Sequence, residues 1–147
     1  MDTLSAERRS DNMRRIRSKD TSPEITVRKL VHGMGFRYRL HVARLPGKPD
    51  LVFARLKKII EVRGCFWHQH NGCSDSRIPK SRIDYWAPKL ARNIKRDREN
   101  ERQLTALGWQ VLTIWECELK SPASYTQRIR RFLSRVHAKS SSLRRPV

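Results

Sequence analysis

Residues 49–63 read Pro-Asp-Leu-Val-Phe-Ala-Arg-Leu-Lys-Lys-Ile-Ile-Glu-Val-Arg, and this stretch decides the fold of the chain. Its two apolar halves are joined by a tight connection, which predicts a β-hairpin. The hairpin places Asp50 and Glu61 on neighbouring strands. Because side chains alternate along a strand, Glu61 and Arg63 share one face. Two carboxylates and a cation are therefore expected at one end of a sheet.

This trio has the composition that phosphodiester hydrolysis needs. Carboxylates bind Mg²⁺, which keeps several waters and can bind a phosphate oxygen. A neighbouring cation stabilises the charge that builds up in the transition state. The spacing follows the PD-(D/E)-x-K pattern with Arg63 in the lysine position, so Asp50, Glu61 and Arg63 are candidate catalytic residues. Since the motif is short, the alternative is a turn aspartate and a solvent-facing strand edge.

The segments around the hairpin predict the element order α-β-β-β-α-β-α, an α/β fold with a mixed sheet flanked by helices. Hydroxyl caps and prolines mark three expected helix starts, at Thr21-Ser22-Pro23-Glu24, Pro88 and Ser121-Pro122. Glycines are expected to end the first two helices, at Gly33 or Gly35 and at Gly108. Further strands are expected over 36–42 and 109–115.

The charge of the chain indicates a polyanionic partner. Against 14 Asp and Glu stand 33 Lys and Arg, a net charge of +19 spread along the whole sequence. Polyphosphate backbone is the expected partner, because each neutralised phosphate releases counterions. Charge alone does not distinguish DNA from RNA or from an anionic membrane surface. The length of 147 residues fits one domain, placed at 21–138 between a basic arm (1–20) and a flexible tail (139–147).

Nothing in the sequence has the apolar core of a signal peptide or the ~20 apolar residues of a membrane span. The protein is therefore expected inside the cell, in a reducing compartment. There its three cysteines are thiols or metal ligands and not disulfides.

A closed zinc site is expected at the end of the hairpin. Its four ligands would be Cys65, His70, Cys73 and Cys117. Three thiolates and one imidazole leave zinc no open position, so the metal would be structural and would tie the long loop over 64–87 to the final strand. In the alternative, Cys65 and Cys117 are small buried apolar residues. His41 and His68 are the alternative imidazoles, and His68 is the better candidate for catalysis.

Three aromatic residues lie among basic residues near both constellations: Phe66, Trp67 and Trp86. Beside a nuclease centre, exposed aromatic rings can act as wedges between base pairs. The alternative is that they pack the small core of the zinc loop, and taken singly the residues favour that interpretation.

Five segments resemble very-short-patch repair (Vsr) endonucleases, in family order over about residues 10–120. They span 19–24, 45–50, 64–73 (Gly-Cys-Phe-Trp-His-Gln-His-Asn-Gly-Cys), 93–98 and 108–117. The resemblance implies a restriction-endonuclease-like fold, catalytic Mg²⁺, structural zinc and a nick on the 5′ side of the T in a T:G mismatch left by deamination of 5-methylcytosine. It also implies a monomer that acts on double-stranded DNA, not on membranes, in the bacterial cytoplasm at the nucleoid. A functional link to a cytosine-5 DNA methyltransferase is expected.

The resemblance also assigns roles to single residues. Asp50, through its carboxylate, and Val62, through its carbonyl, would bind Mg²⁺, and His68 would be the general base. Acidic groups beside the metal or the phosphate would be Glu24 and Asp97. Intercalating residues would be Phe66, Trp67 and Trp86, which reverses the preference for packing, and DNA phosphate contacts would be Lys89, Asn93 and Arg14.

Two positions depart from the family pattern. Histidine is usual where this chain has Arg63, and an apolar residue is usual where it has Glu61. Both departures lead toward the PD-(D/E)-x-K arrangement. Two other classes of protein stay open: a zinc-stapled DNA-binding module without catalysis, and an HNH enzyme. The latter would need a ββα-metal unit, whereas His68 precedes a long loop.

Overall fold

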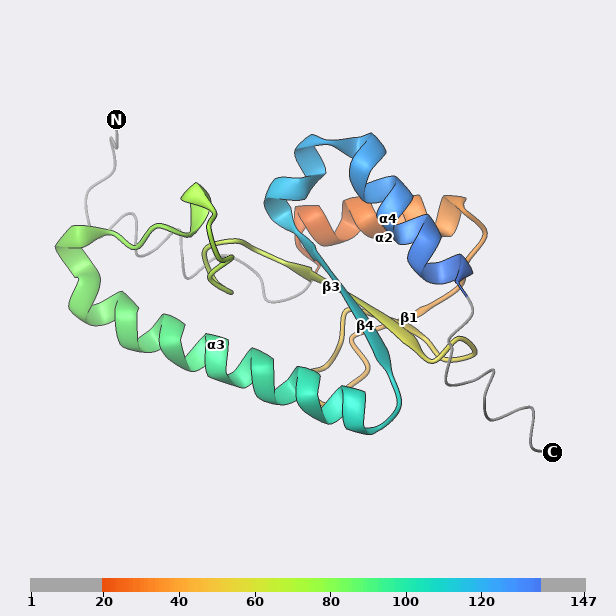
Figure 1. Ribbon diagram of the computed structural model, residues 1–147, viewed down its shortest axis with the longest axis horizontal. Coiled ribbons are helices and arrows are strands. Elements are labelled where there is room, and N and C mark those ends of the chain that lie inside the picture. Colours follow the sequence, from red (N-terminus) through yellow and green to blue (C-terminus); the bar gives the residue numbers. More distant parts are fainter. Residues whose placement is uncertain (1–19, 136–147) are drawn as a thin grey trace.

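The computed structural model describes residues 20–135. Most of the expected arm, including Arg14, and the expected tail lie outside the described residues. Within them the chain forms a four-stranded mixed sheet with helices on both faces (Figure 1), which confirms the predicted fold class. No helix of the described part is long and apolar enough to cross a membrane.

Helices and strands follow each other in the predicted order. They are α2 (Ser22–Gly33), β1 (Arg39–Leu40), β2 (Leu51–Phe53), β3 (Lys58–Arg63), α3 (Ile83–Ala106), β4 (Gln110–Trp115) and α4 (Pro122–Ser134). Short 3-10 turns span Ser74–Ser76, Lys80–Arg82 and Glu116–Lys120. The sheet order is β1-β2-β3-β4, with antiparallel pairing except between β3 and β4, which are parallel. The β2–β3 pair is the predicted hairpin.

Each face of the sheet buries its own apolar cluster. Leu51 and Ile60 pack with α2 and α4, whereas Val52 and Ile59 pack with Leu104 of α3 on the other face. Figure 1 shows α2 and α4 together on one side of the strands and the long helix α3 on the other. Because β2 and the first half of β3 are covered on both faces, all of their residues are buried, and all but Lys58 are apolar.

The start of α2 agrees with its sequence signals. Thr21 is the N-cap, and its hydroxyl accepts a hydrogen bond from the backbone N–H of Glu24 at 3.3 Å. The helix ends at Gly33, and Gly35 follows at a φ of +96°, in the left-handed region that glycine tolerates.

Two predicted boundaries are wrong. Pro88 does not open α3, which begins at Ile83 after the Lys80–Arg82 turn. A proline so near the helix start leaves only the exposed carbonyl of Asp84 without its helical partner, so the helix can contain it. The strand expected over 36–42 shrinks to Arg39–Leu40 because His41, at a φ of +45°, turns the chain away.

Candidate active site and zinc centre

Asp50 and Glu61 meet at the open end of the β2–β3 hairpin. The backbone N–H of Asp50 donates to Oε1 of Glu61 at 3.3 Å, and Oδ2 of Asp50 accepts the backbone N–H of Val62 at 2.8 Å. These bonds bring the two carboxylates together as the hairpin predicts, with Glu61 on β3 and Asp50 directly before β2. The carbonyl of Val62 points to the same side as its N–H, toward Asp50, because both groups of a strand residue share one lateral direction.

Both carboxyl groups resist ionisation in the metal-free protein. Burial, followed by the charge of Glu61, raises the pKa of Asp50 to about 8, against the opposing hydrogen bond from Val62. Burial also raises the pKa of Glu61, while the charge of Arg63 opposes this shift. Two partly buried carboxyls whose charges repel each other are stabilised by a divalent cation. Asp50, Glu61 and the Val62 carbonyl therefore fit a Mg²⁺ site.

Two histidine–carboxylate pairs lie near the two carboxyl groups, one within electrostatic range of Glu61 and one beside Asp50. Nδ1 of His68 is 2.6 Å from Oδ2 of Asp97. Nε2 of His41 is 2.7 Å from Oε2 of Glu24 and 3.9 Å from Oδ1 of Asp50. Because the carboxylate of Asp97 accepts the proton on Nδ1 of His68, Nε2 is the nitrogen left to take up a proton.

A cavity of about 1430 Å³ opens between the start of α2, the 43–48 loop, the zinc loop and α3. Five of its lining residues were expected functional residues with polar or charged side chains: Glu24, His68, Lys89, Asn93 and Asp97. The three expected aromatic residues line the same cavity. The structure thus brings the acid–base groups and the aromatic rings to one place.

The aromatic rings pack edge to face against each other. Phe66 lies 5.3 Å from Trp67 and 5.3 Å from Trp86, and the two tryptophan rings are 5.6 Å apart. Trp86 is only 4% exposed, whereas Phe66 and Trp67 are half-buried. Asn93 donates to the carbonyl of Trp67 at 3.1 Å, and Nζ of Lys89 lies 6.0 Å from the Trp67 ring. Phe66 and Trp67 are therefore the rings that face solvent, with Trp86 behind them.

Arg63 forms an ion pair with a glutamate of α3. Its guanidinium lies 3.6 Å from Oε2 of Glu101 and 6.0 Å from the ring of Trp115. Its charge opposes the rise that burial causes in the pKa of Glu61, so the two residues lie within electrostatic range, as their shared strand face predicts.

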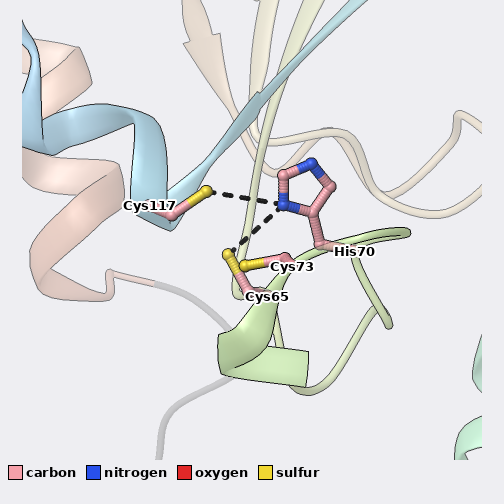
Figure 2. Close-up of side chains that lie close together, drawn as sticks. All are labelled: Cys65, His70, Cys73 and Cys117. Atoms are coloured by element: carbon pink, nitrogen blue, oxygen red, sulfur yellow. Dashed lines mark hydrogen bonds between the residues drawn. The ribbon is translucent and has the colours of Figure 1, made fainter. Parts of the chain in front are cut away.

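The expected zinc ligands converge (Figure 2). The ligand atoms of Cys65, His70, Cys73 and Cys117 all lie within 4.8 Å of one another. Nδ1 of His70 is 3.7 Å from Sγ of Cys65 and 3.4 Å from Sγ of Cys117. Tetrahedral zinc, with its usual bond lengths to sulfur and nitrogen, separates such atoms by about 3.6 Å. The four residues therefore fit zinc, and His41 and His68 are not the imidazole of this cluster.

One tight turn carries the residues between two of the zinc ligands. The backbone N–H of His68 donates to the carbonyl of Gly64 at 3.2 Å, and that of His70 donates to Cys65 at 2.9 Å. The Gln69 side chain donates to the carbonyl of Phe66 at 2.7 Å. The ring of His70 also stacks on the ring of Trp115, at the end of β4, with ring centres 4.2 Å apart.

Two residues of this region have a role that the sequence does not predict. The sequence makes His41 only an alternative zinc ligand, and it assigns no role to Arg28. Arg28 pairs with Glu24, and its NH1 lies 3.3 Å from Oε2 of that carboxylate. The spacing of Arg28 from Glu24, four residues on one helix, was the available signal for the pair. No local pattern links His41 to Glu24.

A family model described as DNA mismatch endonuclease Vsr matches residues 1–74. The chain belongs to the Vsr family. It is 48% identical over 132 residues to the type II nicking enzyme V.XorIIP of Xanthomonas oryzae pv. oryzae, covering 90% of this chain and 96% of that protein. It is 40% identical over 118 residues to the DNA mismatch endonuclease Vsr of Escherichia coli K12, covering 80% and 75%.

Membership of the Vsr family decides between an endonuclease and a non-catalytic module in favour of a DNA endonuclease. The catalytic domain of the homing endonuclease I-Bth0305I has the same fold, with a TM-score of 0.54 at 23% identity, covering 77% of this chain and 94% of that one. His68 lies in the loop between β3 and α3 and not in a ββα unit, which argues against the HNH class.

The raised pKa of Asp50 predicts how the stability of the Mg²⁺-free protein depends on pH. Folding raises this pKa from an ordinary 3.8 to about 8, so the unfolded chain releases the proton at lower pH than the folded one. The free energy of unfolding should therefore fall as pH rises from 4 to 8. At about 3 °C per kcal/mol, the unfolding temperature should drop by several degrees over this range.

Thermal unfolding at a series of pH values, without added Mg²⁺, measures this decline. Asp50→Asn, whose side chain cannot ionise, should lose much of this decline with pH. Added Mg²⁺ should make the unfolding temperature of the wild type depend less on pH. Equal slopes for the wild type and Asp50→Asn would contradict the prediction.

Proposed function

We propose that this Vsr-family endonuclease nicks one strand of duplex DNA on the 5′ side of the T in a T:G mismatch, by Mg²⁺-dependent hydrolysis. One observation carries the proposal: the same cavity is lined by the His68–Asp97 pair and by the aromatic residues Phe66 and Trp67. The groups proposed for hydrolysis and those proposed to detect weakened base pairing therefore lie side by side. The name of the Escherichia coli relative, a DNA mismatch endonuclease, supports this substrate.

The chain's own residues divide the chemistry between them. Asp50, Glu61 and the Val62 carbonyl would hold Mg²⁺, which when bound supplies a Lewis acid for a phosphate oxygen. His68 accepts the proton of the attacking water at Nε2. Asp97 holds Nδ1 and stabilises the imidazolium that results.

DNA binding would use the positive charge beside the aromatic rings. Lys89 and Asn93 lie next to Trp67, and they would contact the phosphates that flank an inserted ring. Deamination of 5-methylcytosine in methylated DNA produces T:G pairs, so we also propose a functional link to a cytosine-5 methyltransferase. We propose that the enzyme acts as a monomer on nucleoid DNA in the bacterial cytoplasm.

Cleavage of three end-labelled duplexes tests the proposal. The duplexes share one sequence and differ at a single pair, which is T:G, T:A or C:G. We expect a nick in the T-containing strand of the T:G duplex alone, and only with Mg²⁺ present. Equal cleavage of T:A, or cleavage without a divalent metal, would overturn the assignment.

Trp67→Ala should reduce discrimination between T:G and T:A more than it reduces affinity for DNA. A ring enters easily only where pairing is already weak, since unstacking a sound step costs ~ a few kcal/mol. The selectivity ratio should therefore fall about tenfold or more. Trp67 is the better probe than Trp86, because truncating a ring that is 4% exposed also removes core packing.

Single-turnover nicking and fluorescence anisotropy on both duplexes measure the two effects of Trp67→Ala. Trp67→Phe, which keeps an aromatic ring, is the control and should retain most of the selectivity. Equal losses of affinity and rate on both duplexes would assign Trp67 to packing alone.

Glu61→Gln tests whether the departure at position 61 is functional. If Glu61 binds Mg²⁺ together with Asp50, the variant should need a higher Mg²⁺ concentration for half-maximal rate and should nick more slowly. If Arg63 leaves Glu101 and contacts the scissile phosphate when DNA binds, Arg63→Ala should cost roughly a hundredfold in rate, as lost transition-state donors do. Arg63→His, with the residue usual in the family, should keep substantial activity. Mg²⁺ titrations that match the wild type for Glu61→Gln would make Glu61 a bystander.

A further inference from the structure

His41 occupies an unusual backbone position at the edge of the sheet. Its φ is +45°, in the left-handed region that few non-glycine residues adopt and that histidine and asparagine tolerate best. Its backbone N–H donates to the carbonyl of Asp50 at 3.1 Å. Strained backbone of this kind persists where the surrounding structure holds it, often at functional sites.

The ring of His41 lies between two carboxylates. Nε2 is 2.7 Å from Oε2 of Glu24 and 3.9 Å from Oδ1 of Asp50. The other oxygen of Asp50, Oδ2, accepts the N–H of Val62 at 2.8 Å. His41 therefore stands beside the Asp50 oxygen that the Val62 backbone does not hold.

Glu24 is fixed by partners on both of its oxygens. Its side chain is 2% exposed; Oε1 accepts the backbone N–H of Asp20 at 3.1 Å, and Oε2 faces both Arg28 and His41. NH1 of Arg28 also lies 2.8 Å from Oδ1 of Asp20. Asp20, Glu24 and His41 are close enough to hold a metal ion, but the guanidinium of Arg28 already supplies positive charge to this cluster.

We infer that His41 is a positioning residue of the endonuclease reaction, which transmits the fixed position of Glu24 to the metal-binding carboxylate of Asp50. The inference rests on the Mg²⁺ site of the proposed function. Glu24 borders the cavity, but its side chain is only 2% exposed, so it would act through His41 and not on the substrate. His68 differs, because it lines the cavity with its partner Asp97 and is 34% exposed, against 17% for His41.

Metal binding without DNA tests this inference apart from activity. Electron paramagnetic resonance of Mn²⁺ added to the zinc-loaded protein reports the affinity of the site, and Asp50→Asn should abolish the specific signal. His41→Ala and Glu24→Gln should each weaken Mn²⁺ binding about 10- to 100-fold, as the loss of groups that orient a ligand does. The double variant should bind no worse than the weaker single variant, because both changes break one connection.

Two further substitutions separate the side chain of His41 from its backbone. His41→Asn tolerates the left-handed conformation but is too short to bridge the carboxylates, so it should bind Mn²⁺ as weakly as His41→Ala. His41→Gln places an amide N–H near the position of Nε2 and should restore much of the affinity. His32→Ala, which removes an exposed histidine from α2, is the control and should change nothing.

The outcomes distinguish this inference from the proposed function. Wild-type Mn²⁺ affinity in His41→Ala, effects of His41→Ala and Glu24→Gln that add up, or equal affinity in His41→Asn and His41→Gln would each overturn the role of His41. If one of these outcomes is observed but Asp50→Asn still loses the metal, the role of His41 is overturned and the proposed Mg²⁺ site stands. Wild-type binding by Asp50→Asn would overturn both.

Discussion

Asp50→Asn is expected to bind a T:G duplex as tightly as the wild type and to nick it about a thousandfold more slowly or worse. The substitution removes a charged oxygen from the metal site and leaves the basic surface unchanged. Bound Mg²⁺ contributes several kcal/mol to such a reaction, and each 1.36 kcal/mol changes the rate about tenfold. The amide also avoids the cost of ionising a buried carboxyl, so the variant should fold at least as well.

Single-turnover nicking at saturating enzyme and anisotropy measurements separate rate from affinity. Asp75→Asn, in the exposed Ser74–Ser76 turn, makes the same chemical change away from the site and should behave as wild type. Affinity of both variants should fall with salt, at a log–log slope of about −0.9 per phosphate contacted. Nicking by Asp50→Asn at the wild-type rate in Mg²⁺ would show that the metal site lies elsewhere.

Cys117→Ser is expected to lose the bound zinc and to lower the free energy of unfolding by several kcal/mol. Cys117 reaches the cluster from the Glu116–Lys120 turn after β4, whereas the other ligands come from one loop. Structural zinc contributes its binding free energy to folding, so loss of a ligand that joins distant segments removes much of it.

Zinc content by atomic absorption and thermal unfolding with and without a chelator measure the effect of Cys117→Ser. Asn71→Ser changes an exposed residue of the same loop and should keep both zinc and stability. Zinc-free purified wild type, together with a variant of equal stability, would show that the cysteines are ordinary buried thiols.

The features predicted correctly are those that the spacing of apolar residues or the types of the residues themselves indicate. The hairpin could be predicted because two apolar segments flank one short connection, and its geometry then placed Asp50 beside Glu61. The convergence of Cys65, His70, Cys73 and Cys117 could be predicted because three cysteines and a histidine are together a typical set of metal ligands. In both cases the types of the residues leave few alternative structures.

Contacts between distant segments could not be predicted where no motif marks both partners. Glu24 and His41 are 17 residues apart in the sequence and meet because α2 packs on one face of the sheet, and no periodicity indicates this contact. The start of α3 was misplaced because a proline usually marks a first turn, whereas the preceding 3-10 turn winds the chain into helix before Pro88. Tertiary context overrode the local signal there.

Phe66, Trp67 and His68 are consecutive residues in a turn whose two ends, Cys65 and His70, belong to the zinc cluster. In the proposed reaction, the sensor of a weak base pair and the acceptor of the water's proton therefore move as one rigid piece. The depth to which the rings enter the duplex would then set the distance between His68 and the DNA backbone. DNA that resists opening would hold the general base out of reach, so the enzyme would check its substrate without a separate proofreading motion.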